Sequence, residues 1–180
     1  MSRLPTRIIR LLAIGLLTTL SSLALALPPA EGSLAPEFSL PDQTGTVRSL
    51  EEFRGNWLLL YFYPRDDTPG CTTEACEFRD HITVINALGA KVVGVSLDDQ
   101  ASHAAFAEKH QLPFALLADS DGTVSARYDA LRDLFVMKMA KRYSFLIDPD
   151  GIIARRYLEV DPDQHAQQVV SDLRELIAKK

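Results

Sequence analysis

The two cysteines of the chain, Cys71 and Cys76, are the residues best suited to chemistry. Cys71 begins a predicted helix after a polar loop, where unpaired backbone N–H groups and the helix dipole favour a negative charge. A thiol in such a position is favoured as the thiolate, which is its nucleophilic form. Thr68 can turn its hydroxyl towards the same point, and Pro64 and Pro69 stiffen the approach. The loop therefore predicts an activated cysteine.

The spacing of the two cysteines is incompatible with a disulfide across an intact helix. On a regular helix, the Cα atoms of residues i and i+5 lie about 8.6 Å apart, on faces about 140° apart. A disulfide needs roughly 4.4–6.8 Å between its Cα atoms. Either the pair stays reduced, or the first turns of the helix unwind whenever the bond forms. A static bond would also gain little, because it closes a short loop. The geometry favours a bond that is made and broken during turnover.

Strands that alternate with helices must position this loop. The sequence predicts strands at 57–63, 91–97 and 114–117, helices at 71–88, 100–110 and 162–178, a short helix after 119–122, and hairpins over 38–50 and 143–158. The alternation predicts an α/β fold, and the second hairpin makes its sheet mixed rather than purely parallel. Such a sheet usually carries its functional groups just past the carboxyl ends of its strands, which is where the cysteine loop falls.

The N-terminal segment has the pattern of a secretory signal peptide. Arg3, Arg7 and Arg10 precede an uncharged apolar run over 11–27, and Ala24-Leu25-Ala26 provides a small-x-small cleavage site. An uncleaved membrane anchor is the alternative, although the run is short for a span of about 20 residues. We therefore expect residues 1–26 to be removed.

Cleavage would leave one acidic domain that works outside the cytoplasm. Loss of the three arginines changes the formal net charge from −5 to −8, which argues against a nucleic-acid partner. Residues 27–36 are rich in proline and small residues and predict an extended lead-in, followed by a single domain over 37–180. The expected location is the periplasm or another extracytoplasmic compartment such as a thylakoid lumen, with no membrane attachment after cleavage.

The loop and the predicted helix resemble the peroxiredoxins. Pro64-x-x-x-Thr68-x-x-Cys71 resembles the active-site signature of that family, and the run over 61–80 with its C-x4-C spacing resembles the Q-type (bacterioferritin-comigratory-protein) subfamily. Residues 141–148 resemble the family's arginine-bearing strand. Over most of the chain, the resemblance implies a thioredoxin-like fold, with a mixed central sheet flanked by helices and an N-terminal hairpin extension.

The resemblance also implies a function and a role for each matching residue. The function is the reduction of hydrogen peroxide and organic hydroperoxides, without a cofactor or metal, by a monomer that a thioredoxin-like protein re-reduces. The implied roles are Cys71 as the peroxidatic thiol that becomes a sulfenic acid, Cys76 as the resolving thiol that forms an intramolecular disulfide with it, Thr68 and Arg142 as contacts of the peroxide, Pro64 as a shield, and Glu74 as a neighbour of the arginine.

Two other function classes stay open on the sequence. A disulfide oxidoreductase of the thioredoxin kind would have a C-x-x-C motif after the strand, which the C-x4-C spacing does not supply. A non-catalytic thiol sensor would use the same oxidation to bind a partner. Peroxide consumption with an external reductant separates an enzyme from a sensor.

The remaining polar candidates are interpreted as structural. The four histidines have no i, i+4 pair beside a third ligand, so solvated helix faces are expected for His81, His103, His110 and His165 rather than a metal site. Asp66 and Asp67 are interpreted as loop charges near a helix N-terminus. Met137 and Met139 are interpreted as apolar gap-fillers.

Overall fold

The computed structural model describes residues 27–179, so the predicted signal segment 1–26 lies outside the described residues. The strands are β1 (Ser39–Pro41), β2 (Val47–Ser49), β3 (Trp57–Phe62), β4 (Ala90–Ser96), β5 (Ala115–Ala118), β6 (Leu131–Asp133), β7 (Lys138–Ala140), β8 (Tyr143–Ile147) and β9 (Ile153–Tyr157). The helices are the 3-10 helix η1 (Leu50–Phe53) and the α-helices α1 (Pro69–Ala87), α2 (Gln100–His110), α3 (Thr123–Arg127) and α4 (His165–Ala178).

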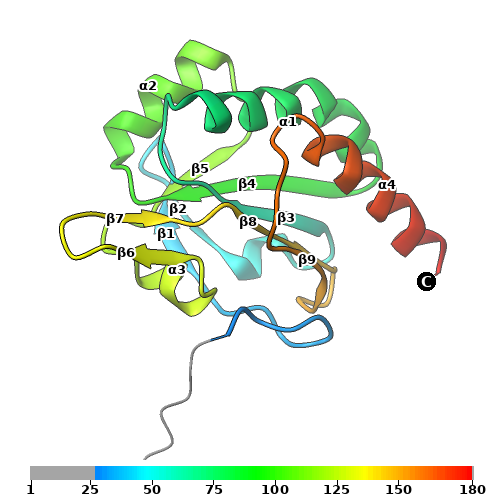
Figure 1. Cartoon of the computed structure of the whole chain (residues 1–180). Helices are drawn as coiled ribbons and strands as arrows, with labels where there is room; N and C mark the ends of the chain where they lie inside the picture. The colour runs from blue at the N-terminus through cyan, green and yellow to red at the C-terminus, as the bar shows by residue number, and fades with distance from the viewer. Residues whose placement is uncertain (1–26, 180) are drawn as a thin grey trace, which may run out of the picture.

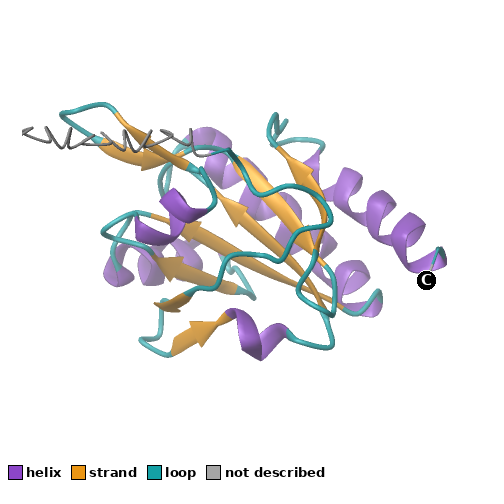
Figure 2. Cartoon of the chain, turned by 90° about the horizontal axis from the view of Figure 1, so that it is seen from below, coloured by secondary structure: helices purple, strands orange, loops and turns teal. Residues whose placement is uncertain are grey.

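The predicted mixed sheet is confirmed, with the strand order β5-β4-β3-β8-β9. Strand β3 pairs in parallel with β4, which pairs in parallel with β5, whereas β8 and β9 run antiparallel. Figure 1 shows α1, α2 and α4 together on one face of this sheet, with α3 and the β1–β2 hairpin on the other. Seen from below, the strands of the sheet lie in front of α1, α2 and α4 (Figure 2). The architecture is thioredoxin-like, with an N-terminal hairpin extension.

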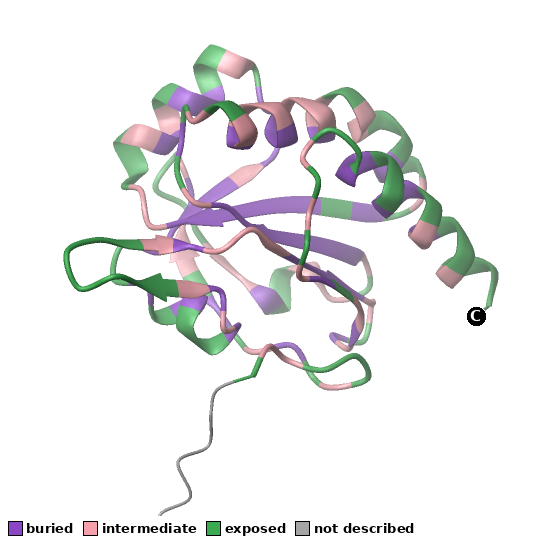
Figure 3. Ribbon diagram, in the orientation of Figure 1, coloured by how far each residue is buried: buried purple, intermediate pink, exposed green. Residues whose placement is uncertain are grey.

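Strand β3 is buried on both faces because its alternate residues enter two different cores. Leu59 and Tyr61 pack with residues of α1, α2 and α4 in one cluster. Leu60 and Phe62 pack in a second cluster with residues of α3 and the N-terminal hairpin. Figure 3 shows the central strands as the buried layer between more exposed helices. The continuous apolar run in the sequence is therefore explained by burial from both sides.

The register of the sheet brings the end of β3 and the start of β8 together. Phe62, the last residue of β3, pairs with Tyr143, the first residue of β8. The loop that follows β3 therefore emerges beside Arg142, which directly precedes β8. This pairing joins the cysteine loop to an arginine 71 residues further along the chain.

A third hairpin, β6–β7, was not predicted from the sequence. Its strands are only three residues long, so they carry too little alternation to be recognised. The turn between them exposes Leu134, Phe135 and Val136. Within residues 27–179, no helix has both the length and the apolar composition to cross a membrane.

Candidate active site

Helix α1 begins two residues earlier than the sequence predicts. Thr68 is its N-cap and Pro69 its first residue, because the fixed φ of proline suits the first turn, where no N–H is needed. Cys71 is thus the third helical residue rather than the first. The first bond onto the helix cap runs from the Thr72 N–H to the Thr68 carbonyl, at 2.9 Å. The Gly70 and Cys71 N–H groups precede that bond, so the buried Cys71 lies in the first turn, at the positive end of the helix dipole.

Arg142 joins the two functional groups of this helix. Its Nη2 donates to the Cys71 sulfur at 3.2 Å, and its Nη1 donates to Glu74 Oε2. A Cβ atom on Gly70 would stand 3.3 Å from Nη2, so a glycine at this position leaves room for the guanidinium. Three residues predicted from the sequence to belong to the site therefore lie together. The Arg142 cation stands between the Cys71 thiol and the Glu74 carboxylate.

Glu74 is the most strongly perturbed acid of the site. Its side chain is fully buried, and one of its oxygens, Oε1, has no hydrogen-bond partner. Burial raises the pKa of Glu74 from 4.5 to about 7, against the opposing charge of Arg142. Burial alone would lower the pKa of Arg142, but the charges of Glu74 and Cys71 raise it. The guanidinium therefore stays charged beside the sulfur.

Replacement of Glu74 by glutamine is expected to change how stability depends on pH. Because the pKa of Glu74 is raised in the native protein, its contribution to the free energy of unfolding is fully present below pH 4.5. That contribution is lost as the pH rises through about 7. Over this window, the free energy of unfolding of the wild type should fall relative to that of Glu74→Gln by on the order of 3 kcal/mol. Urea denaturation of both proteins between pH 4.5 and 8 measures this. A constant difference would contradict the prediction.

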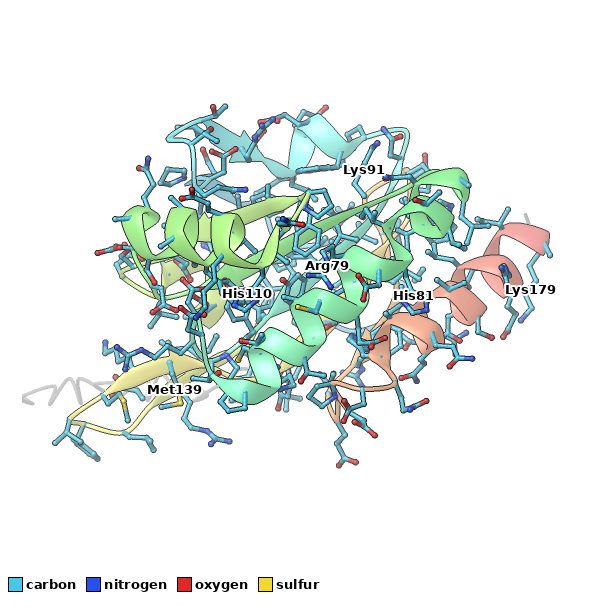
Figure 4. The ribbon with its side chains drawn as sticks, turned by 90° about the horizontal axis from the view of Figure 1, so that it is seen from above. Arg79, His81, Lys91, His110, Met139 and Lys179 are labelled. Carbon is cyan, nitrogen blue, oxygen red and sulfur yellow. The ribbon has the colours of Figure 1, made fainter. Side chains whose placement is uncertain are left out.

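Thr68 and Pro64 line a cavity that leads to this helix start. The cavity has a volume of about 320 Å³ and is walled by Pro64, Arg65, Thr68, Leu97, Asp98, Met137, Lys138 and Met139. The Thr68 hydroxyl donates to the Arg65 carbonyl at 3.0 Å, so its lone pairs remain able to accept a hydrogen bond. Met139 lies on the β7 side of this region (Figure 4). The methionines interpreted as gap-fillers are therefore walls of a cavity beside the cysteine loop.

Asp66 lies in the loop before α1, as predicted, but it is buried and belongs to a hydrogen-bond network that the sequence does not predict. Its carboxylate accepts hydrogen bonds from the hydroxyls of Tyr63 and Ser102, each at 2.7 Å, and its Oδ2 lies 2.9 Å from Nδ1 of His103. Burial by itself raises the pKa of Asp66, but these bonds outweigh it and lower the pKa below 3.8. Sequence reasoning missed this network, because its members are up to 40 residues apart. It holds the cysteine loop against α2.

Two of the four histidines are also buried rather than solvated. His103 is fully buried, with Nε2 3.2 Å from the Leu117 carbonyl oxygen. His165 lies with Nε2 2.9 Å from Ser144 Oγ, and burial lowers its pKa to about 4. His81 and His110 are partly exposed. Among the described residues, no group of three or more potential ligands is arranged to hold a metal ion.

Cys76 lies further along α1 and is only partly buried. Both cysteines are free thiols, and the helix that carries them is continuous from Pro69 to Ala87. Arg142 contacts both Cys71 and Glu74, whereas Cys76 lies further along the same helix. The site therefore contains a buried thiol, Cys71, in contact with a guanidinium, and a second, more accessible thiol, Cys76.

The chain is similar to a family of known proteins over most of its length. The model of the AhpC/TSA family matches residues 32–156. A Coxiella burnetii protein that carries the name of a bcp peroxiredoxin is 41% identical over 148 residues, covering 79% of this chain and 97% of its own. The chloroplastic peroxiredoxin Q of Triticum aestivum is 40% identical over 148 residues, covering 82% and 68% of the two chains.

Solved structures show the same similarity in three dimensions. The peroxidoxin BcpB from Mycobacterium tuberculosis superposes with a TM-score of 0.76 at 38% identity, over 81% of this chain and 96% of its own. The Xanthomonas campestris bacterioferritin comigratory protein superposes with a TM-score of 0.71 at 32% identity, over 77% and 90% of the two chains. That protein is described as having alkyl peroxide reduction activity.

Proposed function

The chain belongs to the AhpC/TSA family and, within it, to the Q-type peroxiredoxins, and on this premise we propose that Cys71 is its peroxidatic thiol. The protein is a thiol-dependent peroxidase. The observation that supports the assignment of Cys71 is its contact with Arg142, 3.2 Å from the sulfur, at the positive end of α1. A cation and a helix N-terminus at one sulfur both favour the thiolate that attacks a peroxide.

In the first step, the Cys71 thiolate attacks the terminal oxygen of a hydroperoxide. The S–O bond forms as the O–O bond breaks, Cys71 becomes a sulfenic acid, and the leaving alkoxide or hydroxide takes up a proton. Negative charge moves from the sulfur to the leaving oxygen during this step. Arg142 lies within reach of the sulfur, so its remaining donors can stabilise the charge along that path.

Thr68 and Pro64 are proposed to orient and shield the peroxide. The Thr68 hydroxyl already donates to the Arg65 carbonyl, so it meets the peroxide as an acceptor and takes a hydrogen bond from its O–H group. Pro64 lines the same cavity and offers no N–H to water. Glu74 is proposed to fix the guanidinium of Arg142 through the Nη1 contact.

The cavity beside Thr68 supports organic hydroperoxides as substrates besides hydrogen peroxide. Its volume of about 320 Å³ exceeds what hydrogen peroxide needs, and Leu97, Met137 and Met139 give it apolar walls. The similar Xanthomonas protein is described as reducing alkyl peroxides. The apolar part of an alkyl hydroperoxide would occupy the cavity while its O–O group lies at Thr68.

In the second step, Cys76 is proposed to resolve the sulfenic acid. Its thiolate attacks the Cys71 sulfur, so that the S–S bond forms, the S–O bond breaks, and hydroxide leaves as water after protonation. Because the two residues lie five apart on a continuous helix, the first turns of α1 must unwind for this bond. A thioredoxin-like protein would then return both thiols, starting from the more exposed Cys76.

We also propose that the protein acts as an exported monomer. The arginines and the apolar run of residues 1–27 support export, and cleavage after Ala26 would release the domain into the periplasm or a comparable compartment such as a thylakoid lumen. N-terminal sequencing of the protein purified from the source compartment, together with its mass in solution, tests both points.

Replacement of Cys76 by serine is expected to stop turnover but spare the first oxidation. Without the resolving thiol, each Cys71 reacts once and waits as sulfenic acid, so turnover with a thioredoxin-like reductant should fall at least about 10²-fold, because the intramolecular reaction is lost. Mass spectrometry should find a Cys71–Cys76 crosslink in the peroxide-treated wild type. A small thiol in excess serves as the control, since it can replace Cys76. Undiminished turnover of the variant, or a wild type without the crosslink, would refute the resolving role.

A further inference from the structure

The peptide unit between Arg65 and Asp66 joins the Thr68 hydroxyl to the rest of the fold. Its carbonyl, that of Arg65, accepts the hydrogen bond of the Thr68 hydroxyl at 3.0 Å. Its N–H, that of Asp66, donates to Asp98 Oδ2 at 2.9 Å. A trans peptide unit is planar and its C=O and N–H groups point in opposite directions, so a rotation of this unit changes both bonds together. The direction of the Thr68 hydroxyl therefore depends on the groups that hold this peptide unit.

Asp98 holds the N–H end of the peptide unit. Its Oδ2 also accepts from the Ser96 hydroxyl at 2.7 Å, and the Ser96 oxygen accepts in turn from the Asp98 N–H at 3.1 Å. Ser96 is the last residue of β4 and is fully buried. The Asp98 carboxylate is therefore fixed to the central sheet, and it holds the Asp66 N–H in one direction.

His103 holds the side chain of Asp66 from α2. Both side chains are buried, with the Nδ1 atom of His103 2.9 Å from Asp66 Oδ2 and its Nε2 atom 3.2 Å from the Leu117 carbonyl oxygen. An ionised carboxylate and a carbonyl can only accept, so each ring nitrogen donates. The ring thus connects Asp66 to β5, and the fixed carboxylate prevents the peptide unit before it from turning.

The next residue of the loop has a backbone conformation that needs support from its surroundings. Asp67 has a φ of 56°, in the left-handed region that most residues avoid and that aspartate tolerates. Its Oδ1 accepts from Lys109 Nζ at 2.9 Å and lies 3.0 Å from His110 Nε2, both in the last turn of α2. Figure 4 shows His110 on the side of α2 that faces α1. The shape of the loop is therefore imposed by contacts with α2 and the end of β4.

We propose that His103 and Asp98 are positioning residues for peroxide binding, because they orient the peptide unit that directs the Thr68 hydroxyl. They act through Asp66 and the Arg65 carbonyl, and no bond is made or broken at either residue. This inference rests on the proposed function, in which Thr68 accepts the hydrogen bond of the peroxide O–H group. While the Thr68 proton is committed to the Arg65 carbonyl, the oxygen presents lone pairs to the cavity. If the peptide unit turns, the hydroxyl rotates and this acceptor is lost.

The test keeps or removes one hydrogen bond at each of the two positions. In His103→Asn the amide nitrogen takes the place of Nδ1 and still donates to Asp66, whereas the longer side chain of His103→Gln places its amide at the distance of Nε2. In Asp98→Asn the amide oxygen still accepts from the Asp66 N–H, and in Asp98→Ala no side-chain acceptor remains. His103→Gln and Asp98→Ala should each slow the oxidation of Cys71 by hydrogen peroxide roughly tenfold, as a displaced binding group does. The two asparagine variants should stay within about threefold of the wild type.

Alkylation of Cys71 by iodoacetamide, measured in the same variants with Cys76→Ser, separates positioning from a change in the thiol itself. Alkylation needs the thiolate but no acceptor for a peroxide O–H group, so its rate should stay within about twofold. His81→Gln is the matched control and should change neither rate, because the His81 ring contacts Glu77 of its own helix. If the buried position 103 does not tolerate glutamine, the two variants of Asp98, which lies at the cavity wall, carry the test.

Thr68→Val removes the hydroxyl and provides the second half of a double-mutant cycle. If His103 and Asp98 act through this hydroxyl, adding His103→Gln or Asp98→Ala to Thr68→Val should slow oxidation no further. A further tenfold loss in the double variants, an unchanged oxidation rate in both single variants, or equal slowing of alkylation and oxidation overturns the positioning role. A wild type that is not oxidised at Cys71 by peroxide would instead refute the proposed function.

Discussion

Replacement of Cys71 by serine is expected to abolish peroxide reduction. A serine hydroxyl fits the same buried space but is not ionised under the helix N-terminus and Arg142, so the nucleophile is lost. Turnover should fall by at least about 10³-fold, as expected when a nucleophile is removed. Peroxide consumption with a thioredoxin-like reductant measures the loss.

The fold of this variant has to be checked independently, because Cys71 is part of the core around α1. Circular dichroism and the melting temperature should stay close to those of the wild type, since serine and cysteine have nearly the same size. The variant also keeps Cys76, so any residual activity would show that the more exposed thiol can react with peroxide. Activity near the wild-type level would refute the assignment of Cys71.

The second large effect is expected from Arg142→Gln. The amide can still donate a hydrogen bond, but the positive charge beside the sulfur is lost, so the rate of the first oxidation should fall about 10²–10³-fold, as for a single donor to a developing charge. Rapid mixing with peroxide, followed by quantification of the remaining Cys71 thiol, isolates this step from resolution and reduction. A rate within threefold of the wild type would contradict the role of Arg142.

Loss of stability could mimic this effect, because the same change leaves Glu74 buried without its cation. An uncompensated buried carboxylate is costly, so Arg142→Gln should be less stable than the wild type at pH 8. In the double variant Arg142→Gln with Glu74→Gln, no buried charge remains, so stability should return. The oxidation rate should stay low. Parallel recovery of rate and stability would indicate that Arg142 acts only through the fold.

Much of the fold could be predicted from the sequence because its signals are local. The apolar run at β3, the i, i+3 and i, i+4 apolar spacing in α1, and the turn residues of the β8–β9 hairpin each depend on neighbouring residues. The β6–β7 hairpin was missed because its strands are too short for a pattern. The predicted start of α1 is two residues late, because a proline is equally compatible with a loop and with the first turn of a helix.

The candidate site also has features that local sequence patterns predict and features that depend on contacts between distant segments. The C-x4-C spacing and the Pro-Thr-Cys pattern identify the loop. The structure places Thr68, Glu74 and Arg142 with Cys71 at one helix start, whereas Cys76 lies further along α1. The burial of Asp66 against His103 could not be predicted, because nothing local distinguishes a buried aspartate from an exposed one in a loop.

The sequence by itself determined which groups are available for chemistry: two thiols at a spacing that an intact helix cannot bridge, at the start of a helix after a buried strand. Only the tertiary structure decided which charges those thiols meet. Arg142 reaches Cys71 because the register of β3 and β8 aligns Phe62 with Tyr143. Glu74 has its raised pKa because the packed core removes water from it. Both effects depend on contacts between distant segments, and such contacts form only when the chain is folded.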